Sequence, residues 1–143
     1  MREDTLRLLD ECSAGISMAI RSIDDVLPSV EDPELLRRLQ NSKKAHQHLR
    51  VQANAQLRSH AAMEKAPDPI ARGMSWLKTN ARLAVQPGDR SVADLVIGGC
   101  NMGVKSLHKY QNQYPAADPK SRDLADRLIS LETELAEELY PYL

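Results

Sequence analysis

Two of the four histidines lie where an imidazole could bind a ligand. His46 and His60 continue the apolar face of a helix predicted over residues 33–63, and a neutral imidazole on such a face needs a partner or a metal. They are fourteen positions apart in the sequence, which is roughly 21 Å of helix, so one ion cannot bind both. We expect core or boundary histidines with satisfied hydrogen bonds; the alternative is a site completed by other helices, through Glu11 or Glu132.

The run from Gly98 to Gly103 is the most unusual part of the chain, because its three glycines fall within one predicted helix. Each costs about 0.8–1.0 kcal/mol relative to alanine, so some other interaction should compensate. One interpretation is a cavity for a ligand; the other, which we expect, is tight packing of this helix on Cys12 and Ala19. The candidate pocket residues are Cys12, His46, Gly99, Cys100, Asn101 and Gly103.

Nucleophilic chemistry at Cys100 is not expected. A reactive thiol needs a lowered pKa and a base within reach, whereas the first basic residue after Cys100 is Lys105 and His108 is two helical turns away. Phosphate-binding loops, Gly-x-Ser-x-Gly elbows and Cys-x-x-Cys pairs are absent from the sequence. We therefore expect no catalytic residue, no cofactor and no enzymatic activity.

The elements that must position these residues are marked by helix-start signals. Asp-Pro pairs at 32–33, 68–69 and 118–119 each place an N-cap aspartate before a proline at the first helical position. Asp89 follows the Pro87-Gly88 breaker and is expected to cap another helix. Apolar residues recur at helical spacing between these signals. The predicted helices are 4–27, 33–63, 69–85, 89–114 and 119–139.

These segments predict a single all-α domain spanning residues 1–143. With no phenylalanine and one tryptophan, the core must consist of aliphatic residues, which favours packed helices. Four long helices predict a four-helix bundle, and short links make the first two and the last two antiparallel neighbours. The short helix at 69–85 allows a crossover of the ferritin-like kind. Trp76, Tyr140 and Tyr142 are candidate interface residues, or they close the core.

Three motifs occur in order along the chain: Asp32-Pro33-Glu34-Leu35, Gly73-Met74-Ser75-Trp76-Leu77-Lys78, and Gly99-Cys100-Asn101-Met102-Gly103 followed by Lys105 and Tyr110. Their order and spacing resemble a family of bacterial four-helix-bundle proteins, a domain of unknown function in the ferritin-like superfamily. The resemblance covers most of the chain. It implies a ferritin-like up-down bundle with a short crossover helix.

The same resemblance implies a degenerate metal site. Members that look metal-competent carry Cys-Glu-x-Gly-Glu in the fourth helix, where this chain has Asn101 and Val104 in place of the two glutamates. Ser13 stands where such members have a glutamate in the first helix. An amide and a valine do not replace two anionic oxygen ligands for iron. No Glu-x-x-His motif occurs either, so we expect no metal.

Charge and composition limit the classes of partner that we expect for this protein. The net charge of −1 gives no global attraction to nucleic acid or anionic lipid, and no apolar run is long enough to span a membrane. The basic face of 33–63 lacks aromatic stacking residues, so we expect a solvated face beside acidic neighbours. The N-terminus does not resemble an export signal, and the two cysteines should be free thiols in the cytoplasm.

The sequence therefore favours a non-catalytic structural or protein-interaction module that self-associates or binds a protein partner, without nucleic acid or membrane. The alternative is a metal- or small-ligand-binding bundle with oxidoreductase-like ancestry. In that case Glu11, His46, Cys100 or Glu132 would bind the ligand around a cavity at residues 98–103.

Overall fold

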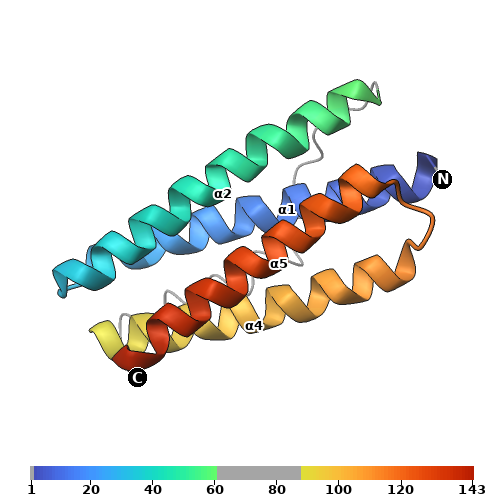
Figure 1. Ribbon diagram of the computed structural model, residues 1–143. Helices are drawn as coiled ribbons and strands as arrows, with labels where there is room; N and C mark the ends of the chain where they lie inside the picture. The colour runs from blue at the N-terminus through green and yellow to red at the C-terminus, as the bar shows by residue number, and fades with distance from the viewer. Residues whose placement is uncertain (1, 61–87) are drawn as a thin grey trace.

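The computed structural model describes residues 2–60 and 88–143, and four α-helices account for most of them (Figure 1). Two of them form an antiparallel pair before the gap, α1 (Arg2–Val26) and α2 (Pro33–Ser59), joined through a short 3-10 helix, η1 (Leu27–Ser29). The pair after the gap consists of α4 (Asp89–Gln113) and α5 (Pro119–Leu139), followed by η2 (Tyr140–Tyr142). The described part is thus all-helical. The short helix expected at 69–85 lies outside the described residues.

Two of the predicted aspartate caps are confirmed. The carboxylate of Asp32 accepts a hydrogen bond from the backbone N–H of Leu35, and Asp118 accepts one from Ser121, both at 2.8 Å. These bonds satisfy first-turn donors that have no partner within the helix. Helix α2 ends at Ser59, four residues before the predicted limit.

The prediction that Asp89 caps its helix is wrong. The N-cap of α4 is Gly88, at a φ of 122° that favours glycine, and Asp89 is the first helical residue. The Asp89 carboxylate instead accepts hydrogen bonds from the backbone N–H groups of Glu31 (2.7 Å) and Asp32 (3.0 Å). Asp89 therefore joins the start of α4 to the link between α1 and α2.

Contacts at the two ends of the bundle define the helix directions. At one end the α1–α2 link meets the start of α4 through Asp89. At the other end Thr5 of α1 accepts a hydrogen bond from the backbone N–H of Asp118, which precedes α5. Helices α2 and α4 therefore run in the same direction, opposite to α1 and α5 (Figure 1). In the ring of four, α1 packs more closely on α2 than on α4.

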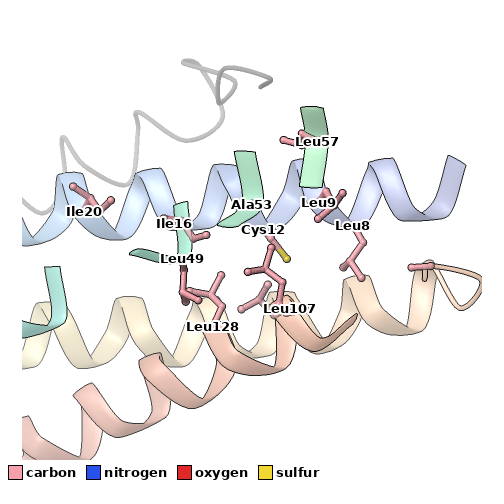
Figure 2. Close-up of a cluster of buried hydrophobic side chains, with 13 residues drawn as sticks. Leu8, Leu9, Cys12, Ile16, Ile20, Leu49, Ala53, Leu57, Leu107 and Leu128 are labelled. Atoms are coloured by element: carbon pink, nitrogen blue, oxygen red, sulfur yellow. The ribbon is translucent and has the colours of Figure 1, made fainter. Parts of the chain in front are cut away.

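The core consists of two clusters of buried aliphatic residues, one toward each end. The cluster near the N-terminus includes Leu8, Ile16, Leu107 and Leu128 and surrounds Cys12, which has no exposed surface (Figure 2). The other includes Ile23, Leu35, Leu39, Val92 and Leu139. Because burial of apolar surface stabilises by about 25 cal/mol per Å², these clusters hold the helices together. No described helix has the length and apolar character to cross a bilayer.

The C-terminal turn also packs on this end of the bundle. The hydroxyl of Tyr142 donates a hydrogen bond to Oδ2 of Asp32 at 3.0 Å, and the ring packs against the second cluster. Of the two roles that the sequence leaves open for Tyr142, an interface residue or a residue that closes the core, this packing matches the second. Tyr142 is half-buried and binds the N-cap residue of α2, since the same Asp32 oxygen accepts from Leu35.

Candidate functional site

A cavity of about 690 Å³, open to solvent on one side, lies midway along the bundle, mainly between α1 and α4. Its floor comes from the other two helices, through His46 of α2 and Leu128, Glu132 and Leu135 of α5. The side toward solvent is lined by exposed residues of α4, including Met102, which is 63% exposed. A volume of this size is typical of sites for small organic molecules.

Small residues on the two facing helices leave this space open. The small residues that line the cavity are Gly15, Ala19, Ser22, Gly98, Gly99, Gly103 and Ser106. A Cβ atom added at Gly98 or Gly99 would meet no atom of residues 2–60 or 88–143 within 4 Å. The expectation that the glycines allow tight packing on α1 is therefore wrong for these two positions. The alternative from the sequence, a cavity beside the glycine run, is what the structure contains.

Gly103 makes room for a carboxylate rather than for a helix. A Cβ atom there would collide with Oε2 of Glu132 and lie 3.0 Å from its Cδ. Glu132 is 7% exposed, and its Oε2 has no hydrogen-bond partner. Burial without a compensating charge raises the pKa of Glu132 from 4.5 to about 8. At neutral pH this carboxyl group is therefore mostly protonated, which is unusual for a glutamate.

His46 is a second buried polar residue that lines the cavity. Its Nδ1 lies 2.8 Å from the backbone oxygen of Ser42, and because a carbonyl can only accept, Nδ1 carries the hydrogen. The ring is completely buried, and burial lowers the pKa of His46 below 6.5. In the neutral ring Nε2 is then a hydrogen-bond acceptor, and it has no partner. His46 is thus on the core face as expected, but only one of its nitrogens is satisfied.

The structure brings four of the six candidate pocket residues together. His46, Gly99, Cys100 and Gly103 all line the cavity. Cys12 does not line it, because its side chain points into the first core cluster. Asn101 is exposed and does not line it either, because it lies on the outer face of α4.

The two cysteines are free, buried thiols. Burial raises the pKa of each to about 12, helped by Glu11 at Cys12 and by Glu132 at Cys100. Both are therefore protonated at physiological pH, and a protonated thiol is a poor nucleophile.

The other candidate residues lie elsewhere. His60 is the C-cap residue of α2 and is not in the core; its Nε2 lies 3.6 Å from a carboxylate oxygen of Asp118. His60 is thus a boundary residue rather than a core residue, which is one of the two positions that the sequence predicts for it. Tyr140 is 49% exposed, and Trp76 lies outside the described residues.

Two further expectations concern charged ligands. Within residues 2–60 and 88–143, no three His, Cys, Asp or Glu side chains gather closely enough to hold a metal ion. Basic residues of α2 form ion pairs with acidic neighbours: Lys43 with Asp24 of α1, and Arg38 with Glu34 and Glu138. This is the solvated face with acidic neighbours that the sequence predicts.

Glu132 is the site residue that sequence patterns alone identify least well. It was one of several acidic side chains that could reach a histidine, and only its position opposite Gly103 distinguishes it. The available signal was its place among the leucines of α5 at residues 128, 131, 135 and 139. Comparison of the chain with known protein families, with characterised proteins and with solved structures finds no match to any of them.

Proposed function

We propose that this protein is a non-catalytic helical bundle that binds a small organic molecule in the cavity between α1 and α4. The observation that carries the proposal is that two residues lining one cavity, His46 and Glu132, each have a buried polar atom without a hydrogen-bond partner among the described residues, Nε2 and Oε2 respectively. A ligand with an apolar body and a polar group would bury its body against the aliphatic walls and hydrogen-bond these atoms.

The free-energy cost of the residues around the cavity supports this proposal. A buried polar atom left without a hydrogen bond costs about 1–3 kcal/mol, and the cavity has two of them. The glycines of α4 cost about 0.8–1.0 kcal/mol each. Since a domain of this size is stable by only about 5–15 kcal/mol, such costs at one place are more readily explained by binding than by packing.

Binding is favoured over catalysis because the reactive groups are poorly prepared for chemistry. Cys100 is held as a thiol, and His46 uses its only ring hydrogen on Ser42. An activated nucleophile needs a base within hydrogen-bonding reach, and His46 Nε2 has no such contact. A cytoplasmic location is part of the proposal, and free buried thiols, which suit a reducing compartment, support it.

The ferritin-like assignment is part of the same proposal. Support comes from α2 and α4 running in the same direction, as in bundles with one long crossover. The proposed relationship is to ferritin-like proteins whose metal site has been lost, with the space at the centre of the bundle retained for a different ligand.

Methyl NMR tests the binding proposal, because Met18 and Met102 both line the cavity. We expect a neutral probe, 2-phenylethanol, or its amine counterpart 2-phenylethylamine, to shift both methionine methyl signals in a saturable way. Gly99→Leu should fill the cavity and weaken this binding at least tenfold. Ala55→Leu, which adds similar bulk at an exposed site on α2, is the matched control. If neither probe shifts the two signals, the proposal fails.

Self-association is a second candidate role. Tyr140 and Leu143 are about half exposed and close together in the C-terminal turn, and aromatic residues of this kind often anchor interfaces. Sedimentation equilibrium should then show a dimer that Tyr140→Ser dissociates. If the protein is a monomer at all concentrations, self-association is excluded, and the ligand proposal is unaffected.

A further inference from the structure

The polar groups of the cavity have a definite hydrogen-bonding character. His46 offers an acceptor, Nε2, because its Nδ1 hydrogen is already donated to the backbone oxygen of Ser42. Glu132 offers carboxyl oxygens, one of them without a partner. When Glu132 is ionised, a ligand that satisfies both groups must therefore donate at least two hydrogen bonds.

The charges around the cavity favour one sign of ligand. The buried charged side chain that lines it is Glu132, whose Oε2 has no hydrogen-bond partner among the described residues. An anionic ligand placed beside the ionised form of this carboxyl group would meet a like charge, which is unfavourable. A cation would be attracted to the Glu132 carboxylate.

The remaining walls are apolar. Leu95, Leu128 and Leu135 line the cavity together with Met18 and Ile23, and Tyr110 contributes an aromatic ring. A hydrated inorganic cation would lose its water shell against such walls, and the described residues do not assemble three ligands to replace it. The fitting cation is thus an organic one, with an apolar body.

We propose that the cavity binds an organic amine, whose ammonium group pairs with the Glu132 carboxylate and donates hydrogen bonds to it and to Nε2 of His46. The apolar body of the amine lies against the leucines of α4 and α5. This inference rests on the proposed function, since it names the class of ligand that the same cavity takes. Gly103 has a part in it, because any side chain there would displace the Glu132 carboxylate.

Proton balance gives this proposal a specific signature. The free protein holds a proton on Glu132, since burial raises the pKa of that carboxyl to about 8, and the free amine is an ammonium ion with a pKa of about 10.4. The complex pairs the ammonium with a carboxylate, so one proton leaves Glu132 for solvent on binding. As pH rises, the affinity for the amine should therefore increase close to tenfold per pH unit up to about pH 8, and it should level off at higher pH.

Several other titratable groups face the cavity. Those that face it from the other helices are Glu11 of α1, His46 of α2, and Asp94, Cys100 and Tyr110 of α4. Of these, burial lowers the pKa of His46 below 6.5 and raises that of Cys100 to about 12. Neither residue therefore titrates between pH 7 and pH 8, where the change at Glu132 is expected.

Calorimetric titration with three matched probes tests the inference: 2-phenylethylamine, 2-phenylethanol and 3-phenylpropanoate. At pH 8 the amine should bind at least tenfold more tightly than the alcohol, and the acid should not bind. In buffers of different ionisation enthalpy at pH 7, amine binding should release close to one proton, and alcohol binding none.

Two variants separate the roles of the polar groups. Glu132→Gln should remove both the preference for the amine and the pH dependence, while alcohol binding remains. Glu134→Gln, at an exposed position two residues along α5, should leave both unchanged. His46→Phe should weaken amine binding about tenfold but keep its dependence on pH.

The outcomes distinguish the two proposals. Alcohol binding as tight as amine binding, with no proton release, would overturn the amine and leave the binding cavity. Equal amine binding by the Glu132→Gln variant would also overturn it. If no probe binds, both proposals are wrong.

Discussion

Replacing Glu132 with glutamine should remove a loss of stability that the protein shows as pH rises. In the folded protein, burial raises the pKa of Glu132 from 4.5 to about 8, whereas in the unfolded chain it returns to its ordinary value. Between these two pH values the folded state binds more protons, so the free energy of unfolding falls as pH rises and levels off above about pH 8. At about 1.4 kcal/mol per pH unit the whole fall is about 5 kcal/mol, with roughly 3.5 kcal/mol between pH 5 and pH 8.

Urea denaturation, monitored by circular dichroism at pH 5, 6, 7 and 8, measures this change in the free energy of unfolding. The Glu132→Gln variant should resemble the wild type at pH 5 and be more stable by about 3–4 kcal/mol at pH 8. His46 has the opposite effect below pH 6.5, because its lowered pKa makes the unfolded state the better proton acceptor. That contribution is common to both proteins and cancels in their difference.

Glu134→Gln is the control, since this glutamate is exposed on the same helix. Its stability should follow the wild type at every pH. If the wild-type and Glu132→Gln curves run parallel from pH 5 to pH 8, the carboxyl is not held neutral by burial, and the argument from an unpartnered Glu132 is refuted.

Three further predictions follow from the cavity and its neighbours. Gly99→Ala should stabilise α4 by about 0.8–1.0 kcal/mol, because a Cβ there meets no atom of the described residues within 4 Å. Gly103→Ala should lack this gain, because its Cβ would have to displace the Glu132 carboxyl group. Thermal unfolding of the two variants measures both effects, and equal stabilisation would contradict the geometry. Cys12 and Cys100, with pKa values near 12, should react with a thiol reagent at pH 8 at least a hundredfold more slowly in the folded protein than in denaturant, and rapid native labelling would show that they are accessible. After Fe(II) or Mn(II) loading and desalting, elemental analysis should find only background metal, and a near-stoichiometric amount would contradict the absence of a three-ligand cluster from the described residues.

Helix positions were predictable because their signals are local. The caps at Asp32 and Asp118 depend on residues three positions away, and both helices begin where the sequence predicts. Asp89 shows the limit of such reasoning. An aspartate beside a glycine can cap its own helix or bind a neighbouring segment, and the choice depends on Glu31, which is 58 residues away in the sequence.

The cavity could be predicted only as one of two alternatives. Glycines on a helix permit close approach and also leave space, and the sequence does not contain the distance between α1 and α4. The buried leucines and isoleucines on either side of the cavity help to set that distance. Similarly, His46 was identified from its position on an apolar face, but its unpartnered Nε2 depends on what three other helices place around it.

The hydrogen bonds at Asp32 have a consequence for how the bundle folds. One carboxylate oxygen caps α2 and also binds Tyr142, 110 residues away, while the backbone N–H of Asp32 binds Asp89. Closing such long loops costs entropy, so the bonds to Tyr142 and Asp89 form only when the two helical hairpins have docked. Asp32 therefore has its full set of hydrogen bonds only in the assembled protein. Local fraying at this end is thereby coupled to separation of the hairpins, which makes unfolding more cooperative.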